Sequence, residues 1–348
     1  MRLPPVLAHN LLLQGELLRV ARRLTDADID FVVLKGVVLL QRVYGRLDAR
    51  PVSDNDLLFR DADLPRALAV LGELGYAPKV QQALPDALAG DAKYVLERHH
   101  HGRPLWIDVH TRPLVPTIHR AEEEPFWERT ETFWLDDVAL RVFSPELTLL
   151  HLVAHAEQHR FCEPRILRDV IAAWNTWTVG PTSDGGAGAG AGAGIDEARL
   201  LGLAARLGLW HVLDFMLTAA AELGELRTPA PLLGSPRARR LAKLLPPSRL
   251  LEPAAPYGAE FYKRGLATLL LWEPDRVFAQ LQKDVLPPLS KLAVIYDRPE
   301  SPVLYLRYAT RPLRPFARLL GWRPPPPAAR SDGHPAIASP LDSHSPHG

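Results

Sequence analysis

Apolar and polar residues follow two rhythms along the first 143 positions. Residues 10–24 place leucine, valine and alanine at helical spacing between arginine and glutamate, which predicts an amphipathic helix. Short, largely apolar runs predict strands at 31–34, 57–59, 104–110, 133–135 and 139–143, the last two forming a hairpin. Helices are expected at 37–44 and 64–74, the second ended by Gly75. This half is therefore of the α/β or α+β type.

The pattern changes at Ser144-Pro145-Glu146, where a hydroxyl N-cap precedes a proline at the first helical position. Periodicity then predicts further helices at 147–159, 165–177, 196–207, 210–223, 235–245 and 259–271. Alternating glycine and alanine at 185–194 resembles a silk-like strand, but between charged helices it favours a flexible linker or loop insertion.

We expect three regions: a first domain at 1–143, a helical domain at 144–322 with the Gly/Ala-rich linker or insertion at 181–195, and a disordered tail at 323–348. The tail is rich in proline, serine and histidine and has too little apolar content to fold.

The balance of acidic and basic residues argues against a protein that binds nucleic acid over a large surface. The 348 residues include 41 basic and 40 acidic side chains, for a formal net charge of +1. A protein that tracks nucleic acid usually carries a clear basic excess, although a local basic patch would still allow nucleic acid as a partner. Cys162 is the single cysteine, which excludes an internal disulfide and a cysteine-based zinc site and fits a reducing compartment. The apolar run 11–13 is too short for a signal peptide or a transmembrane segment, so we expect a cytoplasmic protein.

A basic segment at 303–322 mixes arginine with leucine, tyrosine and tryptophan. Such a mixture suits a membrane surface or a nucleic acid. Pro312 and Pro315 interrupt any continuous helix, and packing within the C-terminal region is the alternative.

Three carboxylates are the candidate reactive groups. Asp54 and Asp56 are two residues apart, so in an extended strand both point to one face and converge on a site suited to Mg²⁺. The same spacing recurs at 26/28, 28/30, 61/63 and 122/124, but the 54/56 pair leads into a buried strand and follows Lys35-Gly36 and Arg50. Asp108, between apolar residues of another predicted strand, needs a partner, either a metal shared with the pair or a buried salt bridge to an arginine or His110.

These residues resemble a family. The pattern is Leu34-Lys35-Gly36, Tyr44, Arg50, Ser53-Asp54-x-Asp56-Leu57-Leu58, Ile107-Asp108-Val109-His110 and Ser144-Pro145-Glu146 with His151 and His155. Over roughly residues 10 to 220 it is similar to the bacterial uncharacterised nucleotidyltransferase family of the polymerase-β-like superfamily. The resemblance implies an α+β fold, a minimal nucleotidyltransferase-type mixed sheet with helices, followed by an all-α C-terminal domain.

By position, the resemblance implies that Asp54 and Asp56 are the metal pair, Asp108 the third carboxylate and Gly36 the glycine of a phosphate-contacting turn. Two Mg²⁺ ions, or Mn²⁺, would serve the transfer of a nucleotidyl group from an NTP, for which ATP is one candidate. Many superfamily members carry serine after this glycine, whereas this chain has Val37.

Other side chains complete the expected nucleotide site. Lys35 would contact phosphate as a point charge in place of the missing serine, beside Ser53. Arg50 is a candidate phosphate contact, with a surface ion pair to Asp48 or Asp54 as the alternative. Asn55 should face away from the carboxylates.

The histidines and one charged helix are harder to assign. His151, His155 and His159 recur every four residues on one helix face, a spacing compatible with a transition metal. We expect His110 and His155 or His159 to line the substrate cleft, with helix packing as the alternative for the latter two. The run 99–101 is expected in a loop, and Arg168 with Asp169 to brace the domain interface.

Together these features predict a nucleotidyltransferase that acts on an unidentified hydroxyl-bearing acceptor and releases pyrophosphate. Two alternatives stay open: a degenerate protein that binds a nucleotide or a partner without catalysis, and a toxin or defence enzyme acting on tRNA or protein. The oligomeric state cannot be read from the sequence.

Overall fold

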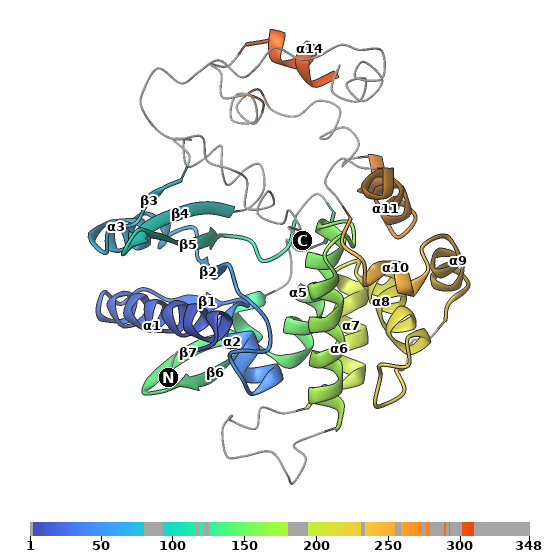
Figure 1. Cartoon of the computed structure of the whole chain (residues 1–348), viewed down its shortest axis with the longest axis horizontal. Coiled ribbons are helices and arrows are strands. Elements are labelled where there is room, and N and C mark those ends of the chain that lie inside the picture. Colours follow the sequence, from blue (N-terminus) through green and yellow to red (C-terminus); the bar gives the residue numbers. More distant parts are fainter. Residues whose placement is uncertain are drawn as a thin grey trace, which may run out of the picture. The chain divides into compact units, whose positions relative to one another are not determined.

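The computed structural model describes residues 3–79, 93–115, 118–120, 125–179, 194–230, 234–254, 259–272, 276–278, 289, 292 and 301–309 (Figure 1). Residues 1–301 form one compact unit and residues 302–348 a second. The described part of the second unit contains the helix α14 (Val303–Ala309). Residues 180–193, which include all but the last residue of the glycine–alanine run, lie outside the described residues, as do the tail at 323–348 and the remainder of the basic segment.

Seven strands in the described part of the first unit form one mixed sheet, in the order β3-β4-β5-β2-β1-β7-β6. Their bounds are β1 (Phe31–Val33), β2 (Asp54–Phe59), β3 (Ala77–Pro78), β4 (Lys93–His100), β5 (Arg103–His110), β6 (Thr130–Leu135) and β7 (Val138–Phe143). The central strand β2 pairs antiparallel with β1 and parallel with β5, and β1 pairs parallel with β7. The predicted mixed sheet is confirmed, and so is the predicted hairpin, which is formed by β6 and β7.

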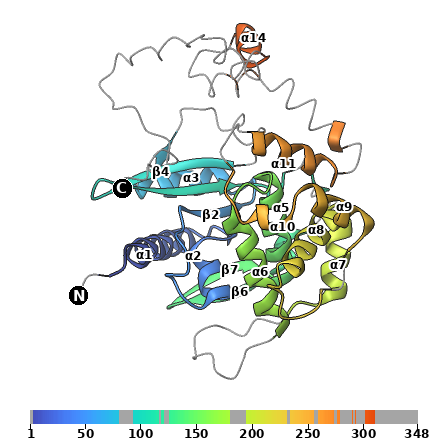
Figure 2. The same ribbon diagram turned by 45° about the vertical axis from the view of Figure 1, so that its right-hand side comes forward.

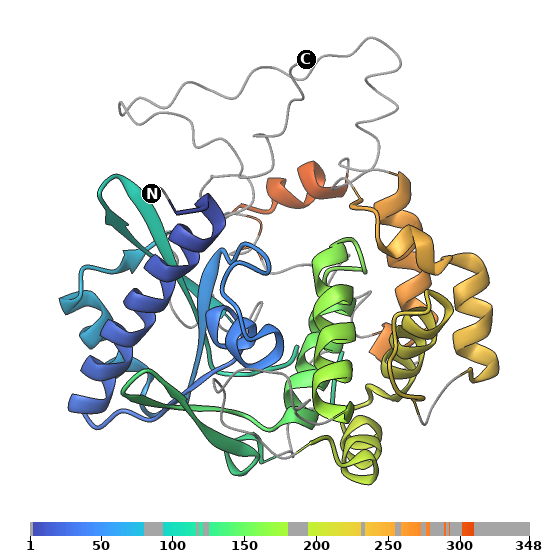
Figure 3. The same ribbon diagram turned by 60° about the horizontal axis from the view of Figure 1, so that its bottom comes forward.

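The pleat of β2 divides the core in two. Leu57 and Phe59 pack in one apolar cluster with residues of α1 (Pro5–Asp26) and α3 (Leu64–Glu73). Leu58, on the opposite face, packs in a second cluster with the helices that follow the sheet. Figure 3 shows α1 lying along one face of the sheet, with the long helices of the second half beyond the other face.

The second half of the unit is helical, as predicted. Its described helices are α5 (Pro145–Gln158), α6 (Pro164–Val179), α7 (Glu197–Arg206), α8 (Trp210–Glu222), α9 (Pro236–Leu244), α10 (Pro247–Leu250) and α11 (Ala259–Leu269). The hydroxyl of Ser144 accepts a hydrogen bond from the backbone N–H of Leu147, which is the predicted N-cap of α5. In Figure 2, α9 and α10 lie beside α8. The fully buried Trp174 of α6 is among the largest side chains of this core.

Three local differences from the sequence prediction concern the first half. The first helix begins at Pro5, because a proline is tolerated in the first helical turn. The expected helix 37–44 is a short α2 (Val37–Leu39) that continues as a π-helical turn (Leu40–Tyr44). The prediction of a loop at 99–101 was wrong for its first two residues, because β4 pairs with β5 through His100 and only His101 lies in the turn.

Among the described residues, no helix is both long enough and apolar enough to cross a membrane. Cys162 is buried and has a free thiol.

Candidate functional site

The parallel pairing of β2 with β5 sets the centre of the site. In this register Asp56 lies opposite Asp108, and Leu58 lies opposite His110. Asp56, Asp108 and His110 each offer one ligand atom, and these atoms all lie within 4.8 Å of one another. The structure therefore brings together two of the three predicted metal carboxylates and adds His110, a residue predicted for the substrate cleft.

Asp56 is the most enclosed member, with 1% of its residue surface exposed. The Lys35 ammonium nitrogen lies 3.0 Å from its Oδ2, and the His110 ring nitrogen Nε2 lies 3.2 Å from its Oδ1. Burial by itself raises the pKa of Asp56, but Lys35 and His110 outweigh it and hold this pKa below its ordinary value. Asp56 is therefore a buried carboxylate that stays charged because two basic groups compensate it.

Asp54 lies on the same face as Asp56, outside the group of three ligand atoms. The Ser53 hydroxyl donates a hydrogen bond of 2.9 Å to its Oδ1. Burial and the neighbouring charge of Asp56 raise the pKa of Asp54. Carboxylates that repel one another at a partly open edge form a donor set that a divalent cation would stabilise, and oxygen ligands of this kind suit Mg²⁺ or Mn²⁺. The residues present thus fit the expected ion.

Asn55 has the orientation predicted for it. Its side-chain Nδ2 donates to the backbone carbonyl of Leu13 in α1, at 3.2 Å, on the face opposite the carboxylates. The alternation of β2 therefore separates the charged face from the face that packs on α1.

The turn after β1 brings the chain close to β2. Gly36 has a φ of +77°, and a Cβ at this position would lie 3.1 Å from the carbonyl oxygen of Asp54. Only glycine accommodates both the left-handed backbone and this close approach. The predicted phosphate turn is thus fixed against the carboxylate strand, while its Lys35 side chain bonds Asp56.

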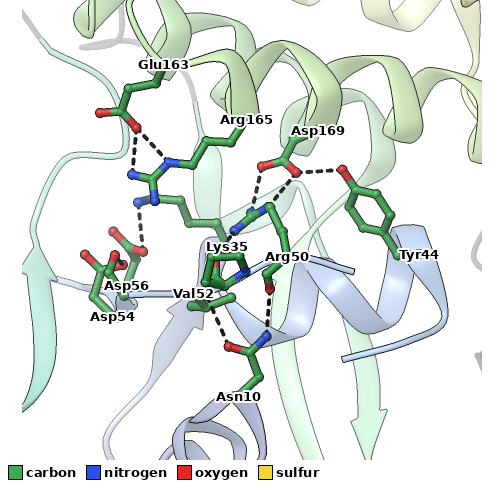
Figure 4. A network of polar contacts seen from close by, with 12 residues as sticks. Asn10, Lys35, Tyr44, Arg50, Val52, Asp54, Asp56, Glu163, Arg165 and Asp169 are labelled. Atoms are coloured by element: carbon green, nitrogen blue, oxygen red, sulfur yellow. Dashed lines mark hydrogen bonds and ion pairs between the residues drawn. The ribbon is translucent and has the colours of Figure 1, made fainter. Parts of the chain in front are cut away.

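Arg50 has a different partner from the two that the sequence suggested. Its guanidinium group donates to both carboxylate oxygens of Asp169 in α6, at 2.8 and 2.7 Å, and the Tyr44 hydroxyl donates to the same carboxylate at 2.8 Å (Figure 4). The surface ion pair with Asp48 or Asp54 was wrong, because Asp48 is bonded by Arg46 instead. Asp169 joins α6 to the sheet half, which is the bracing role predicted for it.

Asn10 supports the loop that leads into β2, and sequence reasoning missed it. This side chain is fully buried in α1; its Nδ2 donates to the carbonyl of Arg50 at 2.7 Å, and its Oδ1 accepts the N–H of Val52 at 3.1 Å. A polar residue at a core position of an amphipathic helix was the signal that could have identified it.

A pocket opens beside the carboxylates, between the sheet half and the helices. It is lined by Lys35, Gly36, Arg50, Val52, Ser53, Asp54, Leu152, His155, Arg165, Ile166 and Asp169. All the expected nucleotide-contacting residues are present in this lining, together with His155. The lining also includes Arg165, for which no role in the site was predicted from the sequence.

The other two histidines of the α5 series lie elsewhere. His159 bonds Glu163 at 2.7 Å and does not appear in the pocket lining. His151 is buried, and its Nδ1 bonds the carbonyl of Pro113 at 3.0 Å. Among the described residues, the histidine series does not form a metal-ligand group.

Comparisons with known proteins bear on this arrangement. A family model described as uncharacterised nucleotidyltransferase matches residues 5–224. A search of curated proteins finds no match.

Solved structures match part of this chain at low identity. A crystal structure of an antigenic nucleotidyltransferase-like protein from Paracoccidioides brasiliensis is 16% identical over 46% of this chain and 74% of that chain, with a TM-score of 0.34. The solution structure of the antibiotic-resistance factor ANT(2'')-Ia is 12% identical over 47% of this chain and 83% of its own, with a TM-score of 0.35. The crystal structure of ANT(2")-Ia in complex with adenylyl-2"-tobramycin is 13% identical over 46% of this chain and 86% of its own, with a TM-score of 0.34.

The family match covers more than half of the 348 residues and includes β1, β2 and β5 with all three carboxylates. The chain therefore belongs to the uncharacterised nucleotidyltransferase family and is a nucleotidyl-transfer enzyme.

Proposed function

We propose that this protein is a metal-dependent nucleotidyltransferase that moves a nucleoside monophosphate from an NTP to a hydroxyl-bearing acceptor and releases pyrophosphate. The observation that carries the proposal is the register of β2 and β5, which places Asp56 opposite Asp108 on the face that bears Asp54, next to a pocket lined by Lys35 and Gly36. This chemistry needs clustered oxygen ligands beside a phosphate-binding turn, and the carboxylates of β2 and β5 next to the turn at Gly36 support that assignment.

Each residue has a proposed role. Asp54, Asp56 and Asp108 would hold Mg²⁺ or Mn²⁺, with His110 supporting Asp56. The bound ion supplies charge neutralisation of the phosphates and activation of the acceptor hydroxyl. The backbone at Gly36 and the side chains of Lys35 and Ser53 would contact phosphate.

The helices contribute the side of the pocket at which we propose that the acceptor binds. His155 lies in the lining contributed by α5, so the acceptor would enter between the helices and the carboxylate strand. His159 does not line the pocket, but its ring packs edge-on against that of His155, with the centroids 4.5 Å apart, and it bonds Glu163.

The proposal is tested by ligand-induced stabilisation. The melting temperature of the full-length protein is measured with each of the four NTPs, with and without Mg²⁺, for the wild type and for the double variant Asp54→Asn/Asp56→Asn. A ligand that binds only the native state stabilises it, by about 2.7 kcal/mol when the free ligand concentration is one hundred times the dissociation constant. This stabilisation raises the melting temperature. We expect a Mg²⁺-dependent rise with at least one NTP that the double variant loses.

A matched control is Asp61→Asn/Asp63→Asn, which removes the same charge from a pair with the same spacing. Asp61 and Asp63 bond Arg112 and Arg66 at the surface, so this variant should retain the nucleotide response. No response of the wild type to any NTP would contradict the proposal. Incorporation of label from an α-³²P-labelled NTP into acceptor-containing extract separates transfer from binding without catalysis.

A further inference from the structure

Three cationic side chains line the pocket, and each one already has a carboxylate partner. Lys35 is paired with Asp56, Arg50 with Asp169, and Arg165 with Glu163. A triphosphate that enters this pocket brings several negative charges, and any of the three cations that binds it directly has to give up its carboxylate partner. The three pairs differ in what this exchange would cost.

The Arg50 pair is held in place. Its side chain is 17% exposed and that of Asp169 is 4% exposed, and the contact has two parallel hydrogen bonds with the Tyr44 hydroxyl added. Separating a buried, bidentate pair leaves an uncompensated charge in the interior, which is strongly unfavourable. Arg50 therefore shapes the pocket and keeps its partner.

Lys35 is similarly committed. Its side chain is 16% exposed, and the Asp56 side chain that it bonds is 1% exposed. Asp54 and Asp108 add to the negative potential around this ammonium group. Lys35 can leave only when another cation takes its place among the carboxylates.

The Arg165 pair is the one that can open. The side chains of Arg165 and Glu163 are 46% and 28% exposed, and their N–O distance is 2.6 Å. Exposed pairs of this kind contribute little net stability, so redirecting Arg165 costs little. Figure 4 shows the guanidinium group of Arg165 on the same side of the site as the ammonium group of Lys35, Asp54 and Asp56.

Glu163 keeps a partner when Arg165 leaves. Its other carboxylate oxygen, Oε1, lies 2.7 Å from His159 Nδ1, whereas Arg165 binds Oε2. The carboxylate therefore keeps a hydrogen-bonding partner after the exchange.

The turn that carries Glu163 is strained and firmly supported. Arg160 and Phe161 both adopt a φ of +54°, which is unfavourable for residues other than glycine. The guanidinium group of Arg264, itself 1% exposed, donates to the carbonyl of Phe161 at 2.6 Å. Strain of this kind persists where the surroundings fix it, and it is common at ligand-binding sites. This turn directly precedes α6, which begins at Pro164 and carries Arg165.

We propose that Arg165 is the arginine that binds the phosphate chain of the NTP, beside the proposed contacts of Lys35, Gly36 and Ser53, and that it exchanges Glu163 for phosphate when the nucleotide enters. A guanidinium fork matches two phosphate oxygens at once. This inference rests on the proposed function and changes the assignment of the phosphate-binding arginine from Arg50 to a residue of the helical half.

The test compares Arg165→Gln with Arg168→Gln. Arg168 is an exposed residue one turn further along α6 that does not line the pocket, so the two variants lose the same charge from the same helix. Dissociation constants are measured with Mg²⁺ for the NTP that stabilises the wild type most, for the corresponding monophosphate and for inorganic tripolyphosphate. Arg165→Lys, which keeps the charge without the fork, is measured in parallel.

We expect Arg165→Gln to weaken NTP and tripolyphosphate binding roughly 10- to 100-fold, as for the loss of a charged hydrogen bond. The monophosphate should change much less, Arg165→Lys should recover part of the loss, and Arg168→Gln should match the wild type. A wild type that binds an NTP while Arg165→Gln binds it equally well would overturn this assignment and leave the proposed function standing. A wild type that binds no NTP would overturn both.

Discussion

Replacing Asp169 by asparagine tests the connection between the sheet half and α6. The change keeps the size of the side chain and an oxygen for the Tyr44 hydroxyl, but it removes the charge that compensates Arg50 and turns an acceptor into a donor that faces the guanidinium group. Breaking a buried ion pair in this way costs about 3–5 kcal/mol. Because the Arg50 side chain is 17% exposed, we expect the lower end, about 3 kcal/mol of unfolding free energy.

The assay is equilibrium unfolding in urea, followed by tryptophan fluorescence and by circular dichroism. Asp48→Asn is the matched control, because its partner Arg46 is 65% exposed and an exposed pair contributes little to stability. The double variant Arg50→Met/Asp169→Leu replaces both charges by apolar side chains and should recover most of the loss. If Asp169→Asn is no more destabilising than Asp48→Asn, the reasoning on the bidentate pair is wrong.

Two further predictions concern polar groups that the site does not use directly. Burial raises the pKa of Glu157 from its ordinary 4.5 to about 8, so between these values the folded protein keeps a proton that the unfolded chain releases, and stability falls as pH rises through this window. The melting temperature of Glu157→Gln should therefore exceed that of the wild type by a margin that grows from pH 5 to pH 9. A difference between the two melting temperatures that does not depend on pH would contradict this interpretation. Asn10→Ala leaves the backbone groups of Arg50 and Val52 without their partner. We expect a loss of about 2–4 kcal/mol in urea unfolding, since each buried unpaired group costs about 1–3 kcal/mol, and a loss below 1 kcal/mol would show that water replaces the side chain.

The elements that could be predicted from the sequence are those with a strong local pattern. The run Phe31-Val32-Val33 is buried on both faces of the sheet, and Ser144 caps α5, so the local signal and the fold agree. The strand β4 was missed because its sequence ends in Glu97-Arg98-His99-His100, which is polar. It becomes a strand through backbone pairing with β5 along its whole length, and this pairing does not require apolar side chains.

In the site, too, local sequence patterns predict some features, whereas others depend on how the elements pack. Asp54 and Asp56 could be identified because strand alternation makes them share a face, and Asp108 because a carboxylate between apolar residues needs a partner. The bonds Arg50–Asp169 and Lys35–Asp56 could not be identified, since the first joins residues 119 positions apart and both depend on how elements pack. Asp108 meets Asp56 through a strand register that no local pattern encodes.

The position of β2 has a consequence for how the site behaves in solution. This strand is the fourth of the seven in the sheet and is paired on both sides. Central strands open only in the rarest, near-global fluctuations, so their amide protons exchange with solvent last. We therefore expect the backbone that carries Asp54 and Asp56 to be among the slowest to exchange, whereas Arg165 projects from the half-exposed start of α6. The proposed binding mode thus combines carboxylates on a rigid strand with one exposed side chain, Arg165, that would adjust to the incoming nucleotide.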